Sequence, residues 1–319
     1  MRCARRRPPP RKIFTQWSEY CAMLQMMKLA LTLFAALLLI SQPSWADVRV
    51  DNANALERAV RNGESGEVIY VVAGRYDLSD LKIPRDLSLI GEEGVTFFSS
   101  QPVAKGILNP LWDASLHVEN IRFEGATSPD LNGAGIRHDG VNLTAINCTF
   151  ENNENGILAT GQEHGKVVIQ SSQFIGNGYG DGYSHGIYLS SGAVLEITSS
   201  SFVGTKIGHH VKSLAATTTI HGSSFDDANG KTSYAVDASR GGAVSITGSS
   251  FTQAADADNS TLFNYDLSRG GDAISLEISG NRIINRKRNG RILRNDTALA
   301  PTIENNDIIN ERGGTLQPQ

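Results

Sequence analysis

Short alternating runs of apolar and polar residues recur along the chain and define a repeating unit. Each unit has an alternating strand, a polar pair rich in Ser and Asn, and then an apolar residue expected to face inward. Repeats of this kind indicate a solenoid, because one unit cannot bury its own apolar face and successive coils must stack. The expected inward residues, separated by 27, 24, 28, 23, 26, 32 and 25 positions, are Phe123, Phe150, Phe174, Phe202, Phe225, Phe251, Ile283 and Ile308.

A second strand in each unit predicts one wall of the solenoid. Its inward residues form the column Ile136, Ile157, Ile187, Val211, Val236, Phe263 and Ile292. The residue after each is expected to face solvent, which gives the outer column Arg137, Leu158, Tyr188, Lys212, Asp237, Asn264 and Leu293. Neighbouring coils lie about 4.8 Å apart, so residues of one column are expected side by side. The sequence therefore predicts an all-β, single-stranded, right-handed parallel β-helix, the hand following the usual preference of crossover connections.

One helical stretch precedes the repeats, at residues 54–62. Leu56, Ala59 and Val60 lie on one face of this stretch, and Asn54 is a candidate N-cap. We expect this short helix to cap the N-terminal end of the solenoid, whose first strand edge is otherwise open to aggregation.

The first 46 residues are not expected to belong to the folded body. Lys28 precedes an apolar run over residues 29–40, and the small-x-small sequence of Ser44, Trp45 and Ala46 follows. A run of twelve residues is too short to span a bilayer, so the segment indicates a signal peptide cleaved after Ala46. An uncleaved anchor is the alternative. We thus expect a β-helix domain over residues 47–310, a disordered tail over 311–319, a periplasmic or secreted location and no stable membrane insertion after cleavage.

Charge and cysteine content change the picture once residues 1–46 are removed. The remaining 273 residues carry 22 Lys and Arg and 32 Asp and Glu, a formal net charge of −10. This charge argues against nucleic-acid binding, whereas an acidic polysaccharide needs only a local basic site. Cys148 is the one cysteine left, so no internal disulfide is expected, and its spacing from Phe150 predicts a small core residue. We expect a monomer.

Side chains able to carry chemistry gather on three consecutive coils, at residues 183–188, 209–213 and 234–242. Stacking is expected to bring Tyr188, Lys212 and Asp237 together on the outer face, with His210 facing outward just before Val211. Such a cluster indicates a functional site. A solvated polar ladder is the alternative.

The cluster suits proton abstraction next to a carboxylate. Cleavage of a uronic-acid polymer by β-elimination needs a base for the C5 proton, a group that neutralises the carboxylate and an acid for the leaving oxygen. The predicted catalytic residues are Lys212 as base, with Arg240, Tyr188 and His210 as acid or as cations beside it. The predicted substrate-binding residues are His185, Tyr183, His209, Tyr234, Asp237 and Arg137.

Two resemblances accompany this reasoning. The helical stretch and the segments 68–72, 74–76 and 87–91 resemble the opening coil of the pectate-lyase-like superfamily, which implies the fold but includes lyases, hydrolases, epimerases and inert binding proteins. Lys212 in Val-Lys-Ser, followed one coil later by Arg240 in Ser-Arg-Gly-Gly, is similar to the alginate and chondroitin B lyase family. That resemblance implies Lys212 as base and Arg240 as its partner. The Asn and Glu residues of that family's calcium site are not identified here, so calcium is the one cofactor left open.

Three other functions are alternatives to a lyase: a hydrolase, a C5-epimerase and a non-catalytic protein. Residues 208–212 are similar to polygalacturonase segments, but inverting hydrolysis needs carboxylates about 6.5–9.5 Å apart, and Asp226 and Asp227 are expected at another corner. A C5-epimerase would use the same groups as a lyase. A non-catalytic glycan-binding or surface-structural protein is the alternative from another class.

Candidate metal ligands and a basic segment lie elsewhere in the chain. No metal site is predicted, because His209 and His210 should point to opposite faces. Residues 178–182 and the pair Asp226 and Asp227 are expected to be a flexible turn and a solvated turn, with calcium ligation as the alternative. The basic residues 286–288, with Arg291 and Arg294, either steer an anionic polymer or protect the C-terminal edge.

Overall fold

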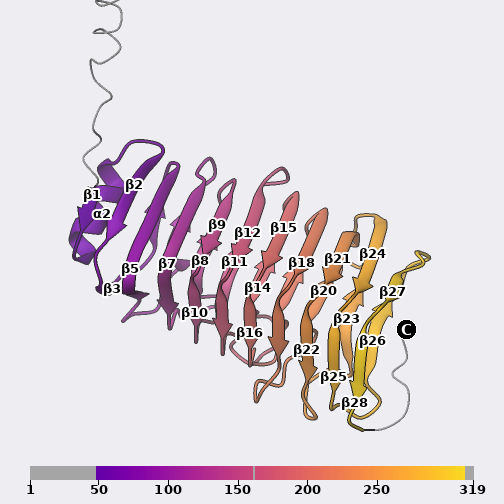
Figure 1. Ribbon diagram of the computed structural model, residues 1–319. Helices are drawn as coiled ribbons and strands as arrows, with labels where there is room; N and C mark the ends of the chain where they lie inside the picture. The colour runs from indigo at the N-terminus through magenta and orange to yellow at the C-terminus, as the bar shows by residue number, and fades with distance from the viewer. Residues whose placement is uncertain (1–47, 161, 313–319) are drawn as a thin grey trace, which may run out of the picture. The chain divides into compact units, whose positions relative to one another are not determined.

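The computed structural model describes residues 48–160 and 162–312 as a parallel β-solenoid (Figure 1). The predicted signal peptide and residues 313–319 of the predicted tail lie outside the described residues. Within the described ranges, no helix has the length and apolar character needed to cross a membrane.

One face of the solenoid is a sheet of nine parallel strands, here called the wall sheet, and its outward side is called the wall. Because each coil adds one strand, residues of successive strands align in columns along the stack. In stacking order the strands are β4 (Leu81–Ile83), β6 (Gly106–Pro110), β8 (Ala134–His138), β11 (Asn155–Ala159), β14 (Ile187–Leu189), β17 (Val211–Ser213), β20 (Val236–Ala238), β23 (Thr261–Tyr265) and β26 (Arg291–Asn295).

A second sheet of 19 strands makes the other two faces. The faces are joined by β5 (Leu87–Phe98) and β7 (Leu116–Glu124), which pair with strands of both. One face holds β1 (Val48–Val50), β2 (Glu67–Val71), β9 (Leu143–Ile146), β12 (Lys166–Gln170), β15 (Val194–Thr198), β18 (Thr217–His221), β21 (Gly242–Thr247), β24 (Ala273–Ser279) and β27 (Thr302–Glu304). The other holds β3 (Gly74–Asp77), β10 (Thr149–Glu151), β13 (Gln173–Ile175), β16 (Ser201–Val203), β19 (Ser224–Asp226), β22 (Ser250–Gln253), β25 (Arg282–Asn285) and β28 (Asp307–Asn310).

The polar pair of each repeat makes the corner between these two faces. Its first residue is left-handed, with φ of 59° at Asn120, 51° at Ser171 and 58° at Gly222. Gly and Asn adopt this left-handed conformation at low cost, and Ser occupies the same position in other coils. The second residue points inward, where Ser200 Oγ accepts the N–H of Ser172 one coil earlier at 3.1 Å. The same contact recurs from coil to coil, so the corner's backbone donors are satisfied inside the core.

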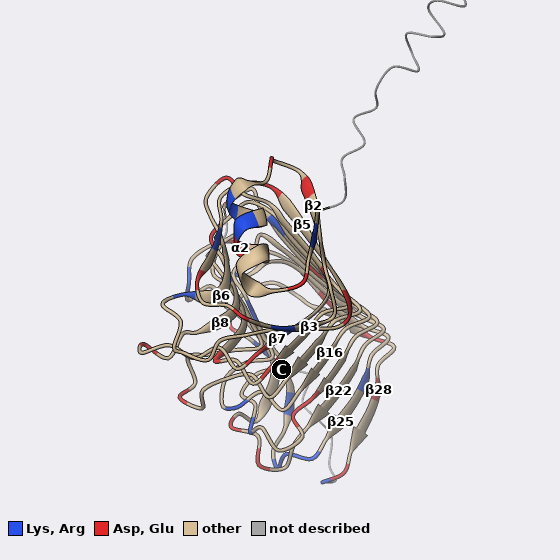
Figure 2. Ribbon diagram, turned by 90° about the vertical axis from the view of Figure 1, so that its left-hand side faces the viewer, with Lys and Arg blue, Asp and Glu red and all other residues tan. Residues whose placement is uncertain are grey.

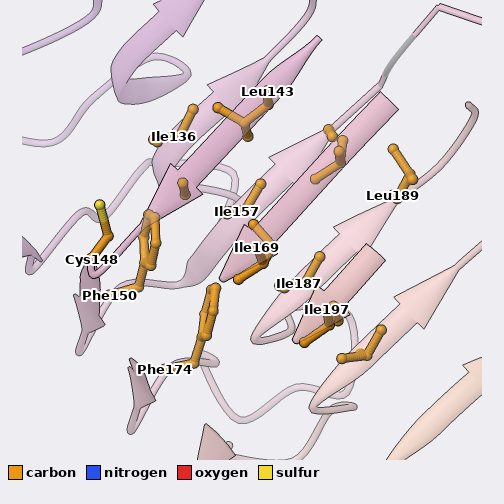
Figure 3. Close-up of a cluster of buried hydrophobic side chains, with 14 of the residues drawn as sticks. Ile136, Leu143, Cys148, Phe150, Ile157, Ile169, Phe174, Ile187, Leu189 and Ile197 are labelled. Atoms are coloured by element: carbon orange, nitrogen blue, oxygen red, sulfur yellow. The ribbon is translucent and has the colours of Figure 1, made fainter. Parts of the chain in front are cut away.

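The expected aromatic column fills the core, and its pairing is confirmed (Figure 3). The rings of Phe174 and Phe202 stack 4.5 Å apart, and Phe202 and Phe225 follow at 4.7 Å. Cys148 is buried beside the column, as predicted. Ile308 is not in the core: it is 41% exposed, because it lies on the last described coil and no described strand covers it.

The helix α2 (Ala53–Asn62) buries Leu56 and Val60 at the N-terminal end of the described stack. Its N-cap is Asn52, whose side chain accepts the Ala55 N–H, so the predicted cap at Asn54 is wrong by two residues. Two neighbouring asparagines of equal cap propensity made the sequence ambiguous at this point.

The register of the predicted wall columns is confirmed from β8 to β23 and wrong at β26. The expected solvent exposure is wrong for Leu158, Asp237 and Asn264, which are buried on the outward side of the wall sheet. Phe263 pairs with Leu293 rather than with Ile292, so Arg294 and not Leu293 continues the outer column. Ile292 and Leu293 are both buried, so the apolar pattern does not distinguish which of them continues the inward column. A positive side chain therefore lies at this position of the wall.

Candidate active site

The wall departs from simple alternation just before each inward residue. Gly156 and Gly186 precede Ile157 and Ile187, yet a Cβ at either glycine would meet the inward ring of Phe174 at 2.8 Å or of Phe202 at 3.3 Å. Two successive residues of each coil thus face the interior. Because of this irregularity, the residue before the pair faces the wall instead of the core.

His210 occupies the inward position that glycine holds in the two preceding coils. Its ring lies beside Phe202 and Phe225 and is fully buried. Nδ1 is 2.8 Å from the Thr205 hydroxyl, and Nε2 is 3.2 Å from Asp227 Oδ1. The prediction that His210 faces outward as a catalytic group is therefore wrong, because it assumed strict alternation up to Val211.

His185 and His209 lie two residues before the inward residues Ile187 and Val211. Strict alternation would place them inside, but they face the wall. Their rings stack with centroids 4.8 Å apart and planes 13° apart. Nδ1 of His185 accepts the His209 N–H at 3.0 Å, and Nδ1 of His209 accepts the Tyr234 N–H at 3.2 Å. The prediction that His209 and His210 point to opposite faces is confirmed.

Lys212 and Asp237 are adjacent on the wall, as predicted. The Lys212 ammonium lies 3.1 Å from Asp237 Oδ2 and 5.6 Å from the centroid of the Tyr188 ring on its other side. His209 Nε2 is 3.5 Å from the same carboxylate oxygen, and the Ser239 hydroxyl donates to it at 3.3 Å. Asp237 thus links the imidazole row to the lysine.

Asn264 completes the surroundings of Asp237 from the next coil. Its Nδ2 donates to Asp237 Oδ1 at 2.8 Å and to Asp266 Oδ2 at 2.9 Å, while its buried Oδ1 has no partner among the described residues. Asp237 is only 3% exposed, whereas 14% of the Lys212 side chain is accessible. A polymer on the wall would therefore meet the lysine and not the aspartate.

Burial determines the protonation of the two wall imidazoles. Burial lowers the pKa of His209 to about 4, against the opposing effect of the Asp237 carboxylate and with further lowering by Lys212 and His210. The pKa of His185 is lowered well below its usual value, first by burial and then by His209 and Lys212. Both rings are neutral at pH 7, so the contact of His209 with Asp237 is not an ion pair.

Arg240, Tyr234 and Tyr183 are the other predicted residues from the coils around Lys212. Arg240 follows β20, and its Nη1 donates to the Leu214 carbonyl at 3.4 Å, in the coil that carries Lys212. Tyr234 packs on His209 with centroids 5.1 Å apart. Tyr183 is 79% exposed in the loop before β14.

Arg137 is on the wall but away from the lysine. It lies three coils from Lys212 along the column and is paired with Asp139 at 3.0 Å. Arg294 mirrors this arrangement at the other end, where Asp296 and then Tyr234 raise its pKa. Seen along the stack (Figure 2), many acidic and basic residues lie in the loops that surround the wall and the other faces.

The structure adds wall residues that sequence reasoning did not assign. Asn155 occupies the same position as His185 and His209, and Ser239 and Asp266 surround Asp237 and Asn264. The recurring spacing Asn155-Gly-Ile and His185-Gly-Ile was the available signal for Asn155. Asn264 was placed in the predicted column but was given no role.

Asp226 and Asp227 are the carboxylates at which the sequence left calcium ligation and hydrolysis open. Within the described ranges, no three His, Cys, Asp or Glu side chains form a group able to hold a metal ion, so no step is assigned to calcium. Asp227 is 3% exposed and accepts the Ala254 N–H, so only Asp226 fits the expected solvated turn. Asp227 contacts His210 behind the wall and is not an opposed carboxylate of a hydrolase.

No protein-family model matches the sequence, and no curated protein matches it. Among solved structures, the chain is similar to the PL6 family alginate lyase AlyGC, with a TM-score of 0.53 and 18% identity over 85% of this chain. A variant of AlyGC with one arginine changed to alanine gives a TM-score of 0.53 and 16% identity over 84% of this chain. The chain spans 40% and 41% of the length of these two structures.

An alginate lyase from Paenibacillus sp. str. FPU-7 is more distant, with a TM-score of 0.46 and 12% identity over 85% of this chain and 97% of that one. The two AlyGC matches show a shared fold and, at such low identity, nothing finer. The resemblance to pectate-lyase-like β-helix proteins that the sequence indicated is thereby confirmed for the fold.

Proposed function

We propose that this protein is a polysaccharide lyase that cleaves a uronate-containing polysaccharide by β-elimination on the wall around Lys212. One observation carries the proposal: an accessible lysine lies between Tyr188 and the buried Asp237 on the wall. The fold that presents this lysine is also that of the alginate lyase AlyGC. The wall extends over nine stacked strands, which suits an extended polymer more than a small ligand.

In the proposed reaction, the Lys212 ammonium first passes a proton to the Asp237 carboxylate, 3.1 Å away, and the neutral amine then takes the C5 proton of a uronate residue. The electrons of the C5–H bond form the C4–C5 double bond, and the bond from C4 to the glycosidic oxygen breaks. Tyr188, beside Lys212, supplies the proton that the leaving oxygen needs. Arg240, in the next coil, supplies positive charge for the uronate carboxylate and for the intermediate.

Further parts of the proposal come from the sequence. We infer right-handed winding, a capping role for α2, a mature domain over residues 47–310, cleavage after Ala46 and export to the periplasm or beyond. We also propose a monomer, and Tyr183 and Arg137 as substrate contacts on the loop and the wall.

A C5-epimerase would use the same base and return a proton to the opposite face of the sugar. A non-catalytic glycan-binding protein would use the wall without proton transfer.

The test follows ultraviolet absorbance of unsaturated uronate while the mature protein is incubated with a panel of polyuronides. Lys212→Met is the test variant. Lys166→Met is the matched control, because Lys166 is paired with Glu196 on another face. We expect absorbance to rise with the wild type and with Lys166→Met, and to stay flat with Lys212→Met. Absence of the signal on every polyuronide, or full activity of Lys212→Met, would refute the proposal.

A further inference from the structure

A row of hydrogen bonds between side chains and backbone N–H groups runs across the wall beside Lys212. Asn155 Oδ1 accepts the His185 N–H at 2.9 Å. His185 Nδ1 then accepts the His209 N–H at 3.0 Å, and His209 Nδ1 accepts the Tyr234 N–H at 3.2 Å. We call this row of Asn155, His185 and His209 the amide ladder. Each of its side chains is fixed by the backbone of the next coil.

The amide ladder determines where the ring protons lie. A backbone N–H can only donate, so the ring nitrogen that faces it must present a lone pair. Nδ1 of His185 and of His209 is therefore unprotonated, and each neutral ring carries its proton on Nε2. Burial, which lowers the pKa of His209 to about 4, keeps the ring in this state at neutral pH. The Nε2–H of His209 lies 3.5 Å from Asp237 Oδ2, the oxygen that also contacts Lys212.

We propose that His209 is a positioning residue: the amide ladder fixes its ring so that Nε2–H points at the Asp237 carboxylate, and this electrostatic contact, longer than a hydrogen bond, keeps the carboxylate beside Lys212. The proposal rests on the proposed function for its effect on turnover, but the geometry it predicts does not. His209 does not need to contact the polymer in this role, so its predicted assignment as a substrate-binding residue changes.

Acid should disrupt this arrangement. His209 is faced by the rings of His185 and Tyr234, by the ammonium of Lys212 and by the Asp237 carboxylate, and His210 is adjacent in the chain. A proton on Nδ1 would oppose the Tyr234 N–H and add a positive charge near Lys212. Activity that depends on the ladder should therefore decline as the pH falls toward 4.

Two amide substitutions separate the role of Nδ1 of His209 as an acceptor from the role of its Nε2–H. His209→Asn keeps an acceptor near the place of Nδ1, as Asn155 does in its own coil, but does not reach Asp237. His209→Gln places an N–H near Nε2 but lacks the acceptor for the Tyr234 N–H. We expect His209→Asn to keep the higher melting temperature and to lose kcat by about 10- to 100-fold with KM within about twofold. His209→Gln should melt lower yet recover most of the kcat.

This crossed order of the two variants is the decisive result. A merely structural role would rank the variants alike in melting temperature and in kcat, and that outcome would overturn the proposal. The tautomers are tested without substrate by nitrogen NMR of ¹⁵N-histidine-labelled protein at pH 7. We expect Nε2–H for His185 and His209, and Nδ1–H on either ring would contradict the ladder.

A crystal structure of His209→Asn tests the positioning step even where no substrate is found. We expect the Asp237 carboxylate to turn away from Lys212, so that the contact of 3.1 Å is lost. An unchanged contact would overturn the proposal. If the contact is lost but the wild type cleaves no polyuronide, the proposed function fails and the positioning role stands.

Discussion

His138 provides a quantitative test of the energetics of the stack. This inward residue of β8 is fully buried, and neither ring nitrogen makes a hydrogen bond of ordinary geometry among the described residues, although the Val141 backbone opposes the lowering of its pKa. The next two coils place Ala159 and Leu189 in the same column, so a leucine side chain is compatible with it. His138→Leu should stabilise the protein at pH 7 by about 1–3 kcal/mol, because it removes two buried polar atoms without partners and nearly conserves volume.

The gain should increase in acid. Burial lowers the pKa of His138 to about 4 from an ordinary value of 6.5. Between these two pH values the unfolded chain binds the proton and the folded chain does not, so stability falls as the pH drops from about 6.5 to about 4. The shift corresponds to about 3 kcal/mol at pH 4. The advantage of His138→Leu over the wild type should therefore grow by about that amount between pH 7 and pH 4.

Urea denaturation followed by far-ultraviolet circular dichroism at pH 7, 5.5 and 4 measures this difference. Because solenoids can unfold in stages, midpoints are compared as well as extrapolated free energies. His221→Gln is the matched control, since His221 is exposed and its loss should leave the pH dependence unchanged. An equal advantage of His138→Leu at pH 7 and pH 4 would refute the reasoning.

Three further predictions concern the aromatic column, the buried His210 and the wall. Phe202→Ala should cost about 3–5 kcal/mol in urea denaturation, because its ring stacks on both neighbours; a loss below that of Phe202→Leu would contradict this. His210→Ala should lower the melting temperature while kcat stays within about twofold, since the ring lies behind the wall; a matching loss of kcat would restore a catalytic role. Asp237→Asn should destabilise by about 3 kcal/mol, because Lys212 loses its counter-ion. Adding Lys212→Met to that variant should recover stability but not activity, and an unchanged urea midpoint for Asp237→Asn would rule out the pair.

The period of the sequence was sufficient to predict the solenoid and its main columns. Phe residues recur at the same strand position of successive coils from Phe123 to Phe251. Tyr188, Lys212 and Asp237 are neighbours because one coil adds one strand. The register was ambiguous where two adjacent residues are both apolar, as at Ile292 and Leu293.

The histidines show what a two-residue period cannot predict. Alternation from Val211 places His210 outside and His209 inside, and the structure has them reversed. The reason is that two successive residues face inward at the start of each wall strand. In other coils the first of the two is a glycine, such as Gly186. The partners of Asp237 come from Asn264 and Ser239, which no motif marks in the sequence. Hydrogen bonds between coils depend on side-chain reach, which spacing does not give.

The most direct test of the account is proton NMR of a polyuronide incubated with the mature protein in D₂O, with Lys212→Met beside it. We expect olefinic signals of new unsaturated chain ends from the wild type and none from the variant. Deuterium at C5 without olefin would indicate an epimerase that uses the same base. A polymer that gains neither olefin nor deuterium would contradict proton abstraction on this wall.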